Sequence, residues 1–237
     1  SLTITSLDNG STYWFKVYGT NTNGSGALSN VSSQIPSTIP DAPKFTSSSY
    51  DDQEVSMTWG TLLNASAGWT DIISFTVLYG NASNALNSST TINGSYNTSL
   101  TIASLDNGST YWFKVFGTNA NGSGDLSNVS SQLPSTTPDA PKFISSSYDN
   151  QQISMTWGTL LNASAGWNDI ISFTVLYGNA SNALNNSTTI SGSSNTSLTI
   201  PSLDNGSTYY FKVFGTNTNG SGDLSNASSQ IPSTTPN

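Results

Sequence analysis

The sequence has no cysteine, no histidine and no arginine, and only 8% of its 237 residues are charged. An average soluble protein has roughly 25% charged residues. Without cysteine and histidine there is no disulfide framework, no zinc finger and no histidine-based acid–base catalysis. Without arginine there is no bidentate donor for phosphate or carboxylate and no Arg-Gly-Asp motif. These absences exclude several large classes of enzyme and binding protein.

The few charges that are present are mostly negative. The five cations are all lysine, and thirteen acidic residues give a net charge of −8. A sequence pI near 4.1 disfavours nucleic acid as a partner, because that binding depends on neutralising phosphates. There is no apolar run long enough to cross a bilayer and no recognisable signal peptide. We therefore predict no nucleic-acid partner, no membrane-spanning segment and no cofactor.

Serine, threonine and asparagine supply the polarity that charged residues do not. The sequence contains 45 Ser, 31 Thr and 27 Asn, a composition that is also found in disordered chains. However, its 25 aromatic residues and its regularly spaced Val, Ile and Leu residues are enough for a packed core. We therefore expect a folded protein.

The sequence repeats with a period of 98 residues, because the string SLDNGST begins at Ser6, Ser104 and Ser202. Residues 41–138 and 139–236 differ at 13 of 98 positions, and residues 1–40 and 99–138 differ at six. A period of this length is typical of an independent domain and not of a solenoid unit. We expect the C-terminal part of a first repeat over 1–38, a second repeat over 39–136 and a third over 137–237. This organisation favours a fragment of a longer array over a protomer whose first repeat is completed by another chain.

Period-two alternation of apolar and polar residues predicts the strands of a repeat. In the third repeat the alternation marks strands over 152–157, 171–177, 196–200 and 209–214. Asn205-Gly206 and Asn219-Gly220 are typical of tight turns, since both residue types tolerate positive φ. No segment has a sustained helical period. About seven short strands separated by turns predict an all-β sandwich.

Three features of the third repeat occur together in a known domain family. They are a tryptophan on the second strand, a Leu-x-x-Gly-x-x-Tyr corner and an Asn-x-x-Gly after the sixth strand: Trp157, Leu203–Tyr209 and Asn217–Gly220. With these motifs the sequence resembles fibronectin type III domains, although Asp204-Asn205 replaces the proline usual in the corner. The resemblance implies tandem fibronectin type III-like (immunoglobulin-like) Greek-key β-sandwiches, used mainly as spacers or binding modules. Function does not follow from so widely used a fold.

Catalysis and metal binding have little support in the sequence. General acid–base catalysis would depend on Asp, a single Glu and Tyr, and no two of these are placed to face each other across a cleft. Asp51, Asp52 and Glu54 form an acidic cluster, but the next repeat keeps only Asp149 of it, so we interpret the cluster as a solvated turn. We predict that the protein is not an enzyme and has no catalytic or metal-binding residues.

Asn-x-Ser/Thr sequons are about twice as frequent as the composition predicts by chance, and most lie in expected turns or at strand ends. The alternative is that Asn, Ser and Gly cluster only because turns favour them. The scarcity of charge favours N-glycosylation as a source of solubility, although adjacent Asn185 and Asn186 are not expected to be modified together. The candidate acceptors are Asn9, Asn23, Asn30, Asn64, Asn81, Asn87, Asn93, Asn97, Asn107, Asn121, Asn128, Asn162, Asn179, Asn185, Asn186, Asn195, Asn205, Asn219 and Asn226.

Aromatic side chains are also expected on the outer face of the sixth strand, on either side of a lysine in each repeat. Such a row could be a lateral packing surface or a platform for sugar rings, unless lysine stems and a nearby loop cover it. Trp69 and Trp167, in the long loop after the second strand, are interpreted as capping the core in preference to binding a ligand. The outward-facing aromatic residues are Trp14, Tyr18, Trp112, Phe116, Tyr210 and Phe214.

Together these features predict a non-catalytic structural repeat region of an extracellular, heavily N-glycosylated fibre, stalk or surface adhesin. Its expected location is extracellular or at the cell surface, and its expected partners are copies of itself and covalent glycans. The alternative is a spacer or carbohydrate-binding region of a secreted polysaccharide-active enzyme, for which Trp69 and Trp167 are the main support. A receptor ectodomain is less favoured, because receptor modules usually differ more from one another.

Overall fold

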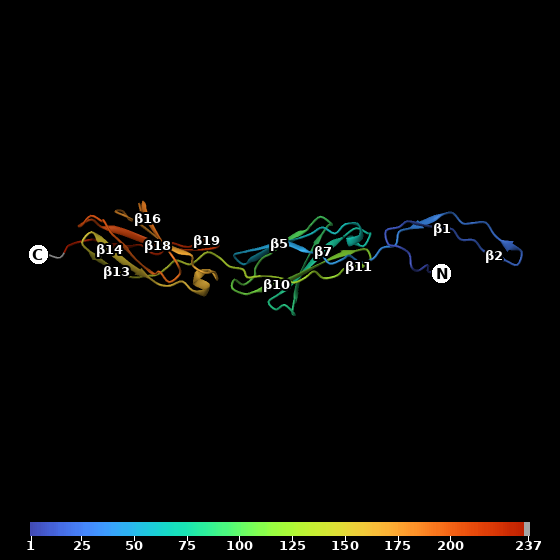
Figure 1. Ribbon diagram of the computed structural model, residues 1–237, viewed down its shortest axis with the longest axis horizontal. Helices are drawn as coiled ribbons and strands as arrows, with labels where there is room; N and C mark the ends of the chain where they lie inside the picture. Colours follow the sequence, from blue (N-terminus) through green and yellow to red (C-terminus); the bar gives the residue numbers. More distant parts are fainter. Residues whose placement is uncertain (235–237) are drawn as a thin grey trace. The chain divides into compact units, whose positions relative to one another are not determined.

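The third repeat folds into two antiparallel sheets with a shared core, as the alternating segments predict. The computed structural model describes residues 1–234 (Figure 1). One sheet has the order β13–β14–β17 and the other the order β16–β15–β18–β19, with β20 also paired to β18. The strands are β13 (Phe143–Asp149), β14 (Gln152–Trp157), β15 (Ser172–Gly178), β16 (Asn186–Ser191), β17 (Ser197–Ile200), β18 (Tyr209–Asn217), β19 (Gly220–Ser221) and β20 (Ser228–Gln230).

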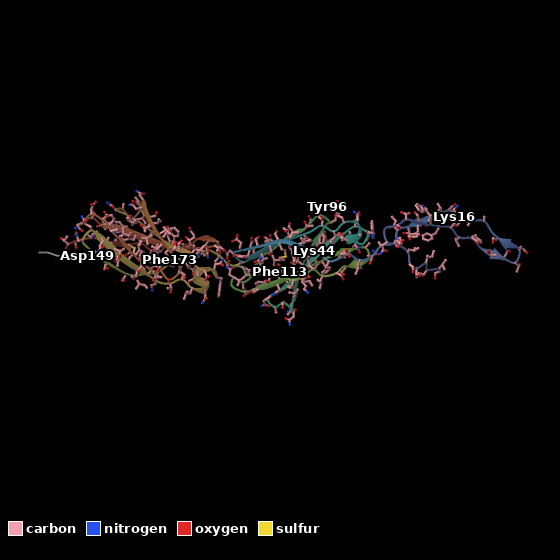
Figure 2. All side chains as sticks on the ribbon, viewed as in Figure 1. Lys16, Lys44, Tyr96, Phe113, Asp149 and Phe173 are labelled. Atoms are coloured by element: carbon pink, nitrogen blue, oxygen red, sulfur yellow. The ribbon has the colours of Figure 1, made fainter. Side chains whose placement is uncertain are left out.

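Strict alternation on the central strands builds the core between the two sheets. β18 alternates buried and half-buried residues over its whole length, and β14 alternates in the same way. Trp157 packs against Phe173, labelled in Figure 2, with ring centroids 5.6 Å apart, and Tyr177 stacks on Phe211. Burying such side chains contributes about 1.5–3 kcal/mol each. The core residues are Ile153, Met155, Trp157, Leu160, Ala165, Ile170, Phe173, Val175, Ile200, Leu203, Tyr209, Phe211 and Val213.

The second repeat has the same two sheets, in the orders β5–β6–β9 and β11–β10–β7–β8, with β12 also paired to β10. Trp59 packs against Phe75 with the same centroid distance of 5.6 Å as the equivalent pair of the third repeat. The strands are β5 (Phe45–Asp51), β6 (Glu54–Trp59), β7 (Ser74–Gly80), β8 (Ser88–Asn93), β9 (Ser99–Ile102), β10 (Tyr111–Asn119), β11 (Gly122–Ser123) and β12 (Ser130–Gln132).

The first repeat forms two small two-stranded pairs, β1 with β4 and β2 with β3. Apolar residues that the second repeat buries are exposed here: Val17 is 72% exposed, whereas its equivalent Val115 is fully buried. The difference arises because the first repeat has no counterpart of β5 or β6, the strands that cover this face in the second repeat. The bounds are β1 (Tyr13–Phe15), β2 (Thr20–Asn21), β3 (Gly24–Ser25) and β4 (Ser32–Gln34).

The strands that alternation predicted are present: β14 has the predicted bounds, and the ends of the others differ by at most three residues. Alternation did not predict β13, β16 and β20, because these strands are rich in Ser, Thr and Asn and have few apolar side chains. Backbone pairing to a neighbour holds them in the sheets. Two short 3₁₀ helices, η1 (Asn64–Ala67) and η2 (Asn162–Ala165), were also not expected. The expected end of the third repeat at 237 lies outside the described residues.

The described chain divides into two compact units whose boundary runs through the second repeat. The first unit comprises Ser1–Ser49, Ser56–Thr101 and Thr110–Gln132. The second comprises Tyr50–Val55, Ile102–Ser109 and the described chain from Leu133 onward. Each unit therefore contains residues of two successive repeats. Every side-chain contact described below lies within one unit.

Candidate functional site

The sequon asparagines lie almost entirely on the surface. Seventeen of the nineteen side chains are exposed, and the other two, Asn107 and Asn219, are half-buried. The two asparagines that are fully buried, Asn119 and Asn217, stand outside any sequon. The surface therefore offers modifiable amides on turns and strand ends of every repeat, where a glycan has room.

Two sequon amides are already engaged with the segment that links successive repeats. The Nδ2 group of Asn121 donates to Ser37 Oγ at 2.8 Å and to the Thr38 carbonyl at 3.0 Å. The Nδ2 group of Asn219 donates to the Ser135 carbonyl at 2.6 Å and to Ser135 Oγ at 3.2 Å. A glycan takes the place of one of the two amide hydrogens. In the folded chain, modification of Asn121 or Asn219 would therefore break one of these bonds.

Two buried asparagines, one in each unit, hydrogen-bond to the segment that links successive repeats: Asn119 binds Thr38, and Asn217 binds Thr136. Asn217 Nδ2 donates to the carbonyls of Thr136 and Ala165 at 2.7 and 2.9 Å, and its Oδ1 accepts the backbone N–H of Asn219. Asn119 makes the equivalent three bonds in the first unit. The family motif drew attention to Asn217 in the sequence, but its contact with a residue 81 positions away has no local signal.

Each loop tryptophan lies against a glycine of a preceding Asn-Gly turn. Trp69 contacts Gly10 in the first unit, and Trp167 contacts Gly108 in the second. The indoles are 43% and 41% exposed, so neither is buried in a core. The interpretation as core caps did not include these glycines as partners, because the contact joins positions that are distant in sequence.

The backbone conformation next to each tryptophan sets the orientation of the indole. η2 is followed by its C-cap Gly166, which has φ 71°, and then by Trp167 with φ 62°. Two successive left-handed residues turn the chain sharply, and the Gly166 carbonyl accepts the N–H of Thr136 at 2.9 Å. η1, Gly68 and Trp69 repeat the arrangement with φ 73° and 62°.

The expected aromatic row is less accessible in the complete repeats than in the first. Trp14 and Tyr18 are 68% and 55% exposed. In the second and third repeats the equivalent side chains, Trp112, Phe116, Tyr210 and Phe214, are half-buried. They lie on β10 and β18, the central strands of their sheets. A platform for sugar rings would therefore have only part of each ring available in these repeats.

The acidic cluster has structural partners. Asp52 Oδ1 accepts from Asn107 Nδ2 at 2.7 Å, and Asp51 Oδ1 accepts the N–H of Asp52 at 2.8 Å. In residues 1–234 there is no group of three or more His, Cys, Asp or Glu side chains arranged to hold a metal. Asp51 and Asp52 thus take part in turn geometry, with Asp52 joining the β5–β6 turn to Asn107.

The cavities beside the loop tryptophans are small. The one next to Trp69, lined by Leu62, Ala67, Ile72 and Tyr96 among others, measures about 220 Å³. Its equivalent next to Trp167 measures about 200 Å³. Pockets that take drug-sized ligands are about 300–1,000 Å³. These cavities favour a structural role for the loop over a small-molecule site.

The arrangement of the sheets and the corner motif agree with a known family. The fibronectin type III domain model matches residues 40–132 and 138–231. The chain belongs to the fibronectin type III family. Its second and third repeats are tandem domains of this family, each a β-sandwich.

One curated protein and one solved structure are similar to these fibronectin type III domains. The Kelch domain-containing protein SSO1033 of Saccharolobus solfataricus is 30% identical over 118 residues, which are 50% of this chain and 15% of that protein. The crystal structure of the chicken CNTN1 FN1–FN3 domains has 18% identity and a TM-score of 0.50, over 93% of this chain and 75% of that one. The likeness to CNTN1 shows the fold alone. In the described part of the chain, no helix has the length and hydrophobicity to cross a membrane.

Proposed function

We propose that these tandem fibronectin type III domains are a non-catalytic structural region of an extracellular, N-glycosylated fibre, stalk or surface adhesin. Its partners are covalent glycans and further copies of the repeat. The observation that carries the proposal is the placement of the sequons: nearly all their asparagines are exposed, whereas the buried asparagines lie outside sequons.

Exposure matters here because the surface has so few charges. With 8% charged residues, hydration of the domains depends on Ser, Thr and Asn and on what is attached to them. A glycan on an exposed amide adds many hydroxyl groups without displacing a core contact. It also shields the edges of the sheets, which would otherwise offer unpaired backbone groups to another chain. Sugar attachment and fold stability are therefore compatible at these positions.

A non-catalytic role is supported by the chemistry of the surface. Asp51 and Asp52 hold turns in place, and the loop cavities are smaller than typical ligand pockets. Fibronectin type III domains are typically structural or adhesion modules. The role as a carbohydrate-binding region of a secreted enzyme loses its main support, because Trp69 and Trp167 lie against Gly10 and Gly108 and are only partly exposed.

Mass-spectrometric mapping of glycopeptides from natively sourced protein tests the proposal. We expect sugars on exposed sequons such as Asn128 and Asn179, and unmodified amides at Asn121 and Asn219, which are bound to the linker. The control is the same chain produced in a host without N-glycosylation, which gives the masses of the bare peptides. Bare asparagines throughout the native protein would refute the proposal.

A further inference from the structure

A contact between a loop tryptophan and the Asn-Gly turn of the preceding repeat occurs twice in the chain, and the proposed function does not depend on it. Trp69 meets Gly10 and Trp167 meets Gly108, with the same six-membered ring atoms facing the glycine in both units. At the third Asn-Gly turn, no atom of residues 1–234 lies within 4 Å of the point where a Cβ on Gly206 would be. Two copies of the turn thus contact an indole, and the third is covered by none of residues 1–234.

Only glycine fits beneath the indole. A Cβ added to Gly10 would lie 2.6 Å from Cε2 and Cε3 of Trp69, and one added to Gly108 would lie 2.5 Å from the same atoms of Trp167. Real Cβ atoms do not approach other atoms so closely, so the ring lies directly on the glycine backbone. The contact therefore requires a glycine in the turn, which has no side chain, and a tryptophan in the loop, whose flat ring covers the glycine backbone.

The turn has the same conformation whether or not an indole covers it. Gly10, Gly108 and Gly206 have φ values of 82°, 79° and 82°. Each donates its N–H to a proline carbonyl further along the chain: Pro36, Pro134 and Pro232, at 2.9–3.0 Å. The Gly206 turn is therefore already in the shape of the two that contact an indole, and ordering it does not oppose binding.

The tryptophan side of the contact is held in a backbone conformation that large residues seldom adopt. Both loop tryptophans have φ 62°, a left-handed backbone conformation that is strained for a non-glycine residue. The linker stabilises this geometry through Thr38 and Thr136, which donate to the carbonyls of Gly68 and Gly166. A strained residue aimed at the same kind of turn in both units indicates that its placement is used.

We infer that the Asn-Gly turn is a docking site for the loop tryptophan of another repeat. At Gly10 and Gly108 the site is filled by the repeat that follows in the chain. The Gly206 turn has the same conformation, and its proposed partner is a further copy of the repeat that presents the equivalent tryptophan. The inference does not rest on glycosylation or on an extracellular location.

Alanine substitutions in the full chain test the occupied site, with an internal control. Gly108→Ala and Gly206→Ala impose the same positive-φ strain, but only Gly108 lies under an indole. We expect Gly108→Ala to lower the calorimetric Tm at least twice as far as Gly206→Ala. Equal losses would overturn the inference.

A double variant keeps this test decisive if Gly108→Ala does not fold. With Trp167→Ala as the background, adding Gly108→Ala should cost no more than Gly206→Ala does, because the indole is gone. If the chain with both Trp167→Ala and Gly108→Ala still fails to fold, the turn needs glycine for another reason and the docking site is refuted. All variants are made in a host without N-glycosylation, so failure of the proposed function cannot affect the result.

The Gly206 turn is tested by adding its proposed partner. The probe is the full chain extended after Pro236 by one further copy of residues 139–236. In this longer chain Gly206→Ala should lower the Tm as much as Gly108→Ala does, and replacing the appended loop tryptophan with alanine should remove the extra loss. If Gly206→Ala costs the same with and without the appended copy, the Gly206 turn does not accept a further repeat.

Discussion

At the scale of single residues, the asparagines of this chain fall into two groups with opposite roles. Most sequon asparagines are exposed at the surface, although a few, such as Asn121, also donate hydrogen bonds to neighbouring groups, whereas Asn119 and Asn217 use their amides inside the protein. The buried Asn217 side chain donates hydrogen bonds to the Thr136 and Ala165 carbonyls and accepts one from the Asn219 N–H. The same residue type is therefore a proposed modification site in one environment and a structural hydrogen-bonding group in the other.

Replacing Asn217 with alanine should lower the free energy of unfolding by about 2 kcal/mol, because buried backbone groups lose their partners. Asn217 is 3% exposed, so water cannot replace these bonds without opening the structure. The control is Asn182→Ala, at an exposed asparagine that is also outside a sequon, where we expect a change within about 0.5 kcal/mol. Urea denaturation measures both. Similar losses at the two positions would contradict the role assigned to Asn217.

At the scale of strands and turns, the sequence predicts those strands that have one buried face, because that face must carry apolar side chains. The pattern Ile153, Met155, Trp157 predicts β14 because one face of the strand must be apolar. In β13, Ser145, Ser146 and Ser147 carry no such signal, because this strand at the edge of its sheet is held by backbone hydrogen bonds that any residue can make. Local pattern therefore identifies central strands and misses polar edge strands.

The candidate site was predictable to a lesser degree than the fold. Sequon positions can be read directly from the sequence, and turn residues are expected to be exposed. The pairing of Trp167 with Gly108 could not be read in this way, because both residues have local explanations: Asn-Gly forms a turn, and tryptophan fits a core. Only the folded unit shows that the glycine also has to leave room for a ring.

The corner between β17 and β18 gives a prediction at the scale of elements. The Tyr209 hydroxyl accepts the backbone N–H of Asp204 at 3.1 Å, which ties the start of β18 to the turn before it. Tyr209→Phe should therefore lower the free energy of unfolding by about 1 kcal/mol. Tyr210→Phe, at the half-buried neighbour on the other face of β18, should have a smaller effect. Urea midpoints of the two variants decide the matter, and a larger loss for Tyr210→Phe would disprove the role of the corner bond.

At the scale of the whole molecule, low charge makes solubility depend strongly on pH unless something else hydrates the surface. The net charge of −8 at pH 7 falls to zero near the sequence pI of about 4.1. Proteins near zero net charge associate more readily. Neutral sugars do not titrate, so they would keep hydrating the surface at a pH where the carboxylates no longer do so.

This difference leads to a comparison between two forms of the same chain. The chain without glycans should become turbid near pH 4.1 and clear at pH 7, where its charge returns. The native glycosylated protein should stay clear at both values, because its hydration does not depend on carboxylate charge. Turbidity measured from pH 3 to 8 at equal concentration tests this, with calorimetry at each pH to confirm that both forms remain folded. If both forms precipitate alike near pH 4.1, or if neither does, then sugars are not what keeps this weakly charged surface dispersed.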